Sequence, residues 1–290
     1  MSDNVAPTGP NNVSQMGSKV LSENKYDKLI QYSAKIIEEY SGDLIEDIRD
    51  YIRDYPDEID RIDELLYKHA ISVIITYRGK ISKEELELLL YRKHKNINQS
   101  YELTDGNVFH VLCFHKSITL EIIKYVIEET DITNENINKL DRDDWSILHC
   151  LCMNESVTLP MVKYIIEDTE FNRELLNIID GFGNNILHIL CYNEGITLPI
   201  IKYIIKNTNI NVNQTNIYNC NIIYYLCDIK QFDPNKLLEI IKYIVEETDF
   251  NIENINQRSS DNKRPIDCLS DDKIEIKEYL SGFTSVPGEL

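Results

Sequence analysis

Pairs of short apolar segments recur along this chain, with polar, turn-forming residues between them. The residues of segment 185–192 are mostly apolar. In segment 198–206, one helical face carries Ile200, Ile201, Ile204 and Ile205. Spacings of three and four residues predict helices, and neither helix of a pair can bury its apolar side alone. The pattern therefore predicts helix pairs that stack on neighbouring copies and share one continuous core.

Three markers recur with nearly the same period and identify the copies. Histidines in the related frames VFHVLC, ILHCLC and ILHILC stand 39 residues apart, at His110, His149 and His188. Lys-Tyr pairs begin at Lys124, Lys163, Lys202 and Lys242. The segments ITL, VTLP and ITLP keep a third register, and Tyr224 in IIYYLC follows the last histidine by 36 residues. Agreement among independent markers is the signature of a repeat array.

An acidic helical pattern precedes the repeats. Between Glu38 and Glu64, apolar residues at helical spacing are accompanied by twelve acidic and three basic residues, a net charge of −9. Because these charges lie opposite the apolar stripe, a solvated helix face accounts for most of them. The alternative is that the acidic face attracts a basic partner.

Four segments are expected along the chain. Residues 1–23 are rich in Gly, Pro, Ser and Asn and predict a disordered tail. Residues 24–64 form the acidic helical region, and residues 65–281 form the repeat array, whose leading unit is divergent. Residues 282–290 form a C-terminal tail.

The turn in the most regular unit carries a known pattern. The segment DGFGNNILH, from Asp180 to His188, nearly spells D-x-x-G-x-T-P-L-H, and the segment from Asp141 to His149 matches it more loosely. These residues resemble the ankyrin-repeat family, and the resemblance extends over about residues 65–280. It implies an all-α fold, an ankyrin-type repeat solenoid of about five repeats, with the acidic helices as an N-terminal helical capping region.

The units depart from the family pattern in length. They run to 39 residues against the family's 33, with two extra residues expected between the helices and four after the second helix. The position after the second helix, commonly Gly in the family, holds Thr130, Thr169, Thr208 and Thr248. The resemblance therefore leaves the path from helix to turn open, whereas the stacking of units is unaffected.

Charge and composition argue against several functions. The formal charge of −19 disfavours nucleic acid and anionic membranes as partners, since a duplex needs Lys and Arg to displace its counterions. No apolar run is long enough to span a membrane, and the N-terminus lacks the pattern of a signal peptide. Seven cysteines without disulfide-framework spacing indicate a reducing compartment. We expect a cytoplasmic protein, with the nucleus, or a host cell in the case of an effector, as alternatives.

His and Cys recur three residues apart in the first helices, as in His188 with Cys191. The spacing could hold a metal, but each repeat supplies only two of the four ligands of a structural zinc site. The resemblance implies that the His ring hydrogen-bonds backbone between units and that the Cys fills a small-residue position. No phosphate loop, HExxH motif or nucleophile elbow is present. We expect no catalysis, metal or cofactor; a metal-dependent or thiol enzyme is the alternative, which elemental analysis would test.

The resemblance implies a concave binding face made of the turn tips and the exposed side of the first helices. The tips would present Arg142, Asp143, Trp145, Phe182, Asn184, Ile217 and Tyr218. The first helices would present Phe114, His115, Met153, Asn154, Tyr192 and Asn193. Exposed aromatic and Met side chains in a row are typical of interface anchors. Trp145 and Phe182 could instead pack turn against turn, and for Trp145 both interpretations stay open.

The expected function is non-catalytic protein–protein interaction, in which a scaffold binds a partner protein through this face. The alternative is an adaptor or host-directed effector whose N-terminal helices recruit a second protein. Deleting residues 1–64 separates the two, because an adaptor would lose one partner and keep the other. The sequence identifies neither the partner nor the oligomeric state.

Overall fold

The computed structural model describes residues 105–283, together with Ser82, Lys83, Leu86, Leu90, Ile97, Asn98 and Ser100. The expected disordered tail (1–23) and acidic helical region (24–64) lie outside the described residues. So do most of the divergent leading unit, expected from residue 65, and residues 284–290 of the expected C-terminal tail. The repeats that follow this unit are numbered from the one that begins with Val108. Residues 105–283 belong to one compact unit of the chain.

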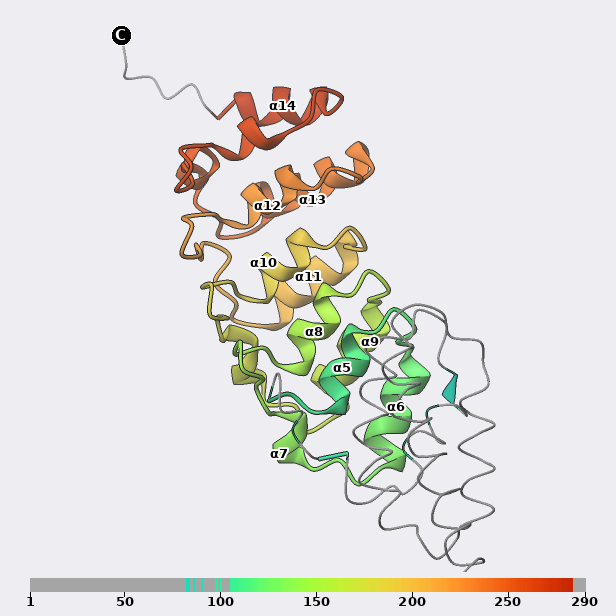
Figure 1. The fold of residues 1–290 in the computed structure, drawn as a ribbon. Helices are drawn as coiled ribbons and strands as arrows, with labels where there is room; N and C mark the ends of the chain where they lie inside the picture. Colours follow the sequence, from blue (N-terminus) through green and yellow to red (C-terminus); the bar gives the residue numbers. More distant parts are fainter. Residues whose placement is uncertain are drawn as a thin grey trace, which may run out of the picture. The chain divides into compact units, whose positions relative to one another are not determined.

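Residues 105–283 fold into helix pairs that stack in chain order (Figure 1). The first helices of the pairs are α5 (Val108–Phe114), α8 (Ile147–Met153), α10 (Ile186–Tyr192) and α12 (Ile222–Asp228). The second helices are α6 (Leu120–Glu129), α9 (Leu159–Glu167), α11 (Leu198–Asn207) and α13 (Pro234–Glu247). The last pair consists of η4 (Pro265–Cys268), a 3-10 helix, and α14 (Ile274–Ser281). No strand occurs in these described residues, and the predicted all-α repeat solenoid is confirmed.

The core runs between successive first helices, which are buried on nearly every side. Helix α8 contacts both α5 and α10, and α12 contacts both α10 and η4. All of α10 except Tyr192 is buried. In α11, Ile200, Ile201 and Ile204 are buried as the spacing predicts, whereas Ile205 is only half-buried. Full burial of an Ile or Leu side chain contributes about 1.5–3 kcal/mol, so stacking rather than intrinsic helix propensity holds these short helices.

A capping box stabilises the start of three first helices. Their N-cap side chains accept the backbone N–H of a histidine at the third helical position, and these caps are Asn107, Ser146 and Asn185. The ring Nδ1 of the histidine accepts the backbone N–H of the cap in return, in His110, His149 and His188. This reciprocal pair satisfies donors that every helix start leaves free. The repeated histidine therefore has a local structural role.

A threonine follows each second helix where the family commonly has Gly. Its hydroxyl donates to the carbonyl oxygen four residues earlier at 2.5–2.7 Å, in Thr130, Thr169, Thr208 and Thr248. The backbone of Thr130, Thr208 and Thr248 is extended. An extended backbone requires no glycine, so threonine is tolerated at this position. Its hydroxyl group satisfies a terminal carbonyl of the helix, and the chain leaves the helix directly.

The residues inserted after the second helix form a short helix in three repeats. These are α7 (Asn134–Ile137) and the 3-10 helices η2 (Arg173–Asn177) and η3 (Ile252–Asn256). Each buries one apolar side chain against the stack, namely Ile137, Leu176 and Ile255. The third repeat has no helix in residues 208–216. This repeat is also shorter, because Tyr224 follows His188 by 36 residues instead of 39.

Candidate functional site

One acidic or amide side chain shapes each of three successive turns between helix pairs. Oδ1 of Asp180 accepts the backbone N–H groups of Phe182 and Asn184 at 2.9 and 2.8 Å. Asp141 and Asn216 make the same pair of contacts in the neighbouring turns. The fourth position of each turn has a positive φ, at Asp144, Gly183, Asn219 and Asn262. Gly, Asn and Asp adopt this backbone region most readily, so the residue types fix the turn.

Backbone hydrogen bonds join the turns of successive repeats. The N–H of Gly181 donates to the carbonyl of Asp143 at 3.3 Å, and that of Ile217 donates to the carbonyl of Phe182 at 2.9 Å. The rings of Phe182 and Tyr218 stack with centroids 6.5 Å apart. Phe182, Ile217 and Tyr218 are 49%, 64% and 47% exposed. Three predicted tip residues thus form one exposed apolar group on a backbone tied from repeat to repeat.

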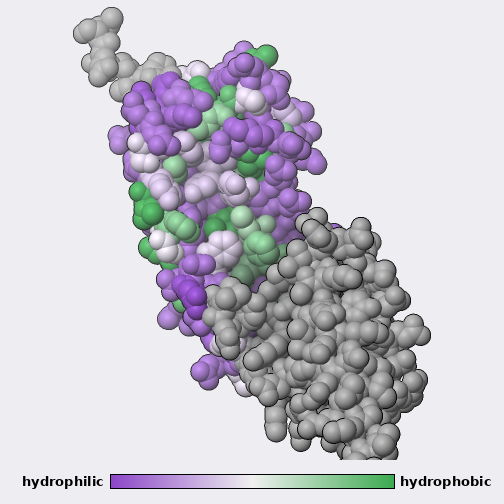
Figure 2. Space-filling model, viewed as in Figure 1, coloured by the Kyte–Doolittle hydropathy of each residue, from purple (hydrophilic) through white to green (hydrophobic). Residues whose placement is uncertain are grey.

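Figure 2 shows hydrophobic residues at the edge of the repeat array where the loops between helix pairs lie in Figure 1. Elsewhere, most of the coloured surface in this view is hydrophilic. The apolar residues at this edge therefore form limited areas among hydrophilic ones.

The first turn is more polar and more closely packed. Trp145 is half-buried, and its ring N–H donates to Oδ2 of Asp180 in the next turn at 3.3 Å. Arg142 is exposed and pairs with Asp105 at 3.3 Å, and Asp143 is exposed. For Trp145, these contacts favour packing between turns over a free anchor, because its polar atom already has a partner.

Asn184 is buried, contrary to its predicted place on the surface. Its amide nitrogen donates to Asp180 at 3.1 Å. Its amide oxygen accepts from the amide of Asn216 and the hydroxyl of Tyr225, at 3.0 and 3.1 Å. With all these bonds made inside the protein, Asn184 stabilises the turn and offers no exposed contact.

The loops after the first helices bury three further residues that the sequence predicts to be exposed, namely His115, Asn154 and Asn193. The amide of Asn193 donates to the carbonyls of Cys152 and Asn154 at 2.8 and 2.9 Å. The amide of Asn154 donates in the same way to the carbonyls of Cys113 and His115, at 3.0 and 2.7 Å. We call Asn154 and Asn193 the asparagine ladder, which holds each loop on the preceding one. Sequence reasoning missed it because a loop asparagine is usually solvated.

The last residues of the first helices keep their predicted exposure. Phe114 and Tyr192 are 56% and 52% exposed, and Met153 between them in the series is half-buried. The Tyr192 ring meets the Tyr225 ring edge to face, with centroids 5.9 Å apart. These three side chains occupy the same position in successive repeats and form a second row, of which Phe114 and Tyr192 are exposed.

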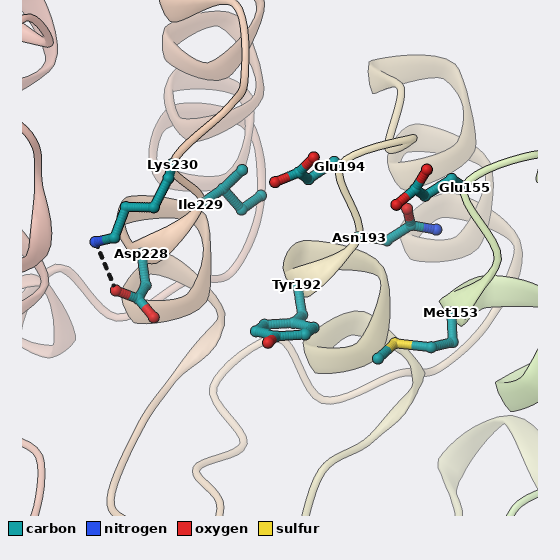
Figure 3. A pocket seen from close by; sticks show the side chains of 8 residues that line it. All are labelled: Met153, Glu155, Tyr192, Asn193, Glu194, Asp228, Ile229 and Lys230. Carbon is teal, nitrogen blue, oxygen red and sulfur yellow. Dashed lines mark hydrogen bonds and ion pairs between the residues drawn. The ribbon is translucent and has the colours of Figure 1, made fainter.

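A pocket of about 330 Å³ lies beside Tyr192 (Figure 3). Its apolar lining consists of Met153, Tyr192 and Ile229, and its charged lining consists of Glu155, Glu194, Asp228 and Lys230. The four charged residues were not predicted from the sequence. The available signal was the altered spacing around Tyr224, which indicates that the fourth repeat is built differently.

The repeated histidines are buried and neutral at physiological pH. Burial lowers the pKa of His110, His149 and His188 from 6.5 to about 4. Nε2 of His110 donates to the carbonyl of Lys139 in the next repeat at 3.1 Å, the bridge that the resemblance implies. Nε2 of His149 and of His188 lies near backbone groups but outside hydrogen-bond geometry.

The cysteines three residues after these histidines are also buried. Burial raises the pKa of Cys113, Cys152 and Cys191 well above its usual range, which keeps the thiols protonated. Within the described residues, no three His, Cys, Asp or Glu side chains are close enough to hold a metal ion. A neutral imidazole and a protonated thiol in a packed core fit the structural role that the family resemblance implies for both.

Comparison with known families matches residues 109–216 to the family model described as ankyrin repeats, in three copies. The match covers the helix pairs from α5 to α11 and confirms the resemblance in the sequence. No curated protein matches the chain. Among the described residues, no helix combines the length and apolar character needed to cross a membrane.

Proposed function

We propose that this ankyrin-repeat protein is a non-catalytic scaffold that binds a partner protein. The proposed surface combines the tip residues Phe182, Ile217 and Tyr218 with the helix-end row of Phe114, Met153 and Tyr192. Ankyrin repeats generally mediate protein–protein interaction, and the exposed apolar side chains support these two rows as the binding face.

The exposure of large apolar side chains carries the proposal. Among the described residues, eight large hydrophobic side chains are exposed, and five belong to this surface: Phe114, Phe182, Tyr192, Ile217 and Tyr218. Aromatic side chains are the commonest binding anchors because they bury a large area at a low cost in conformational entropy. The capped helices and bonded turns beneath them support the proposal, since a preorganised surface loses little freedom on binding.

The absence of catalysis is part of the same proposal. The histidines and cysteines that recur in the repeats face the core, and the pKa shifts keep the imidazoles neutral and the thiols protonated. A nucleophile must be exposed and activated. These two residue types are therefore assigned to packing.

The role of the tip residues in partner binding is tested by replacing Phe182, Ile217 and Tyr218 with Ala in the full chain. We expect affinity capture from the native cell, followed by quantitative mass spectrometry, to lose the partner that the unmodified chain retains. Loss of a central anchor commonly costs 2 kcal/mol or more, roughly a thirtyfold loss of affinity. The matched control replaces Ile252 and Ile274, which are equally exposed outside this surface. Retention of the same partners by the tip variant would refute the proposed surface.

A further inference from the structure

The pocket beside Tyr192 lies where the asparagine ladder stops. Counting five residues from His149, His188 and Tyr224 gives Asn154, Asn193 and Ile229. The first two reach back to carbonyl groups of the preceding loop, whereas the buried Ile229 side chain has no amide to donate. The loops of the third and fourth repeats are therefore not joined in this way, and the pocket opens between them.

The loop of the fourth repeat is held from its other side instead. The side-chain ammonium of Lys273, itself buried, donates to the carbonyl of Ile229 from the last repeat. Lys230 pairs with Asp228 at 2.9 Å and donates to the carbonyl of Cys268 at 3.2 Å. Both lysines thus bind this loop to the last repeat, at the C-terminal end of the stack. The wall of the pocket that this loop forms is therefore fixed by packing.

On the opposite wall, the loops of the second and third repeats pack closely. A Cβ atom at Gly195 would lie only 2.2 Å from the carbonyl oxygen of Glu155, so this approach requires glycine. The close packing brings the carboxylates of Glu155 and Glu194 to the same side of the pocket (Figure 3). Among the described residues, neither carboxylate makes an ion pair or a hydrogen bond, and both residues are exposed.

The lining combines an aromatic ring with an excess of negative charge. The ring of Tyr192 lies between the Asp228–Lys230 pair and Met153 (Figure 3). Three carboxylates and one ammonium leave the lining with a net charge of −2, and the single ammonium is already paired. At about 330 Å³, the pocket is at the lower end of the range for small ligands, which suits one long side chain.

We propose that this pocket receives an arginine side chain from a segment of the bound protein, an inference that rests on the proposed protein-binding function. The guanidinium group stacks on the exposed face of Tyr192, while its N–H groups reach the carboxylates of Glu155 and Glu194. Its methylene groups pack against Met153 and Ile229. Charge complementarity selects a cationic occupant, and the planar aromatic ring favours a guanidinium over an ammonium.

The test uses the isotope-labelled full chain and two peptides that differ in one group. The first is a capped Gly-Gly-Arg-Gly-Gly peptide, and the second carries citrulline, which keeps the shape of arginine but has no charge. We expect the arginine peptide to cause saturable chemical-shift changes in residues 192–195 and 228–230 at concentrations up to about 20 mM, above the millimolar affinity range of weak ligands. The citrulline peptide should bind at least severalfold more weakly.

A double variant identifies the carboxylates that are responsible. Glu155→Gln with Glu194→Gln should lower the affinity for the arginine peptide roughly three- to tenfold, because each exposed ion pair contributes modestly. Glu121→Gln with Glu135→Gln, which removes the same charge in the first repeat, should leave affinity unchanged. Equal thermal midpoints would show that both variants are folded.

Three results would overturn the inference: no saturable shifts, equal binding of the citrulline peptide, or unchanged affinity in the Glu155/Glu194 variant. None of the substituted residues belongs to the turn tips. Partner capture that depends on Phe182, Ile217 and Tyr218 would therefore leave the scaffold function standing while only the arginine pocket failed.

Discussion

The third and fourth repeats share a helix-pair fold but are joined to their N-terminal neighbours in different ways. In the third repeat, His188 completes a capping box and Asn193 hydrogen-bonds to the loop before it. In the fourth, Tyr224 and Ile229 occupy the equivalent positions, and the asparagine ladder ends. The helices still stack in both, so these polar links are not needed for the fold. Where they are absent, the chain gains a pocket.

The second helices show no such break. Each lysine of the Lys-Tyr pairs lies over a tyrosine ring of the following repeat, as with Lys163 over Tyr203 at 5.2 Å. Lys202 continues the series over Tyr243 at 4.8 Å, past the point where the asparagine ladder ends. The fourth repeat is therefore held through its second helix, and the loops on the other side are free to differ.

The largest effect is expected from acidification, which should destabilise the first three repeats more than the fourth. The pKa of His110, His149 and His188 is about 4 in the fold and about 6.5 in an unfolded chain. Because the folded pKa is lowered, the stabilising contribution is complete above pH 6.5 and is lost as the pH falls towards 4. The loss is on the order of 3 kcal/mol for each histidine. In hydrogen-exchange measurements from pH 7 down to pH 5, the backbone amides of residues 108–207 should lose protection before those of residues 222–281.

His188→Gln provides the control, because Gln at the third helical position can also complete a capping box. The free energy of unfolding of this variant should depend less steeply on pH, by about one third, since it removes one of the three histidines whose pKa burial lowers to about 4. An unchanged slope in denaturant titrations would contradict the assignment of the pH dependence to these histidines.

Asn193→Ile gives the third repeat the residue type that the fourth repeat has at the equivalent position, Ile229. The substitution removes the donor for the carbonyls of Cys152 and Asn154 and the acceptor for the N–H of Gly195. We expect urea titration to show that the free energy of unfolding falls by about 2–4 kcal/mol, because buried polar groups lose their partners. Ile229→Val, which changes only one methylene at the equivalent position, should cost about 1 kcal/mol. Equal losses would show that the ladder contributes little.

The smallest effect is expected in the lysine–tyrosine series. Lys163→Met keeps the apolar stem and removes the charge over Tyr203, so the free energy of unfolding should fall by about 0.5–1 kcal/mol. Lys202→Met should cost less, since Lys206 also lies over the Tyr243 ring at 5.9 Å. A larger loss for Lys202→Met would contradict this account of the second helices.

The sequence was sufficient to predict the repeated helix pairs. The apolar period is a local signal, and both helices of a repeat obey it. The exposure of Phe182, Ile217, Tyr218 and Tyr192 was predicted through the family resemblance, because equivalent positions in a stack face the same way. Whether these residues bind a partner stays a proposal.

Exposure in the loops could not be predicted in the same way. Asn154, Asn193 and Asn184 are polar and follow or precede helices, which normally places them in water. They are buried because a neighbouring repeat presents unpaired carbonyl groups or side chains to them. That complementarity depends on residues 32 to 41 positions away, and no local pattern encodes it.

The sequence by itself determined that this protein is a stack of helix pairs, because apolar periodicity and repetition leave stacking as the only way to bury both helices. Only the tertiary structure decided which polar residues close the gaps between repeats and which gap remains open. The pocket beside Tyr192 depends on one missing amide at Ile229 and on the close approach of Gly195 to Glu155. Both are properties of neighbouring loops in space, which become visible only when the repeats are stacked.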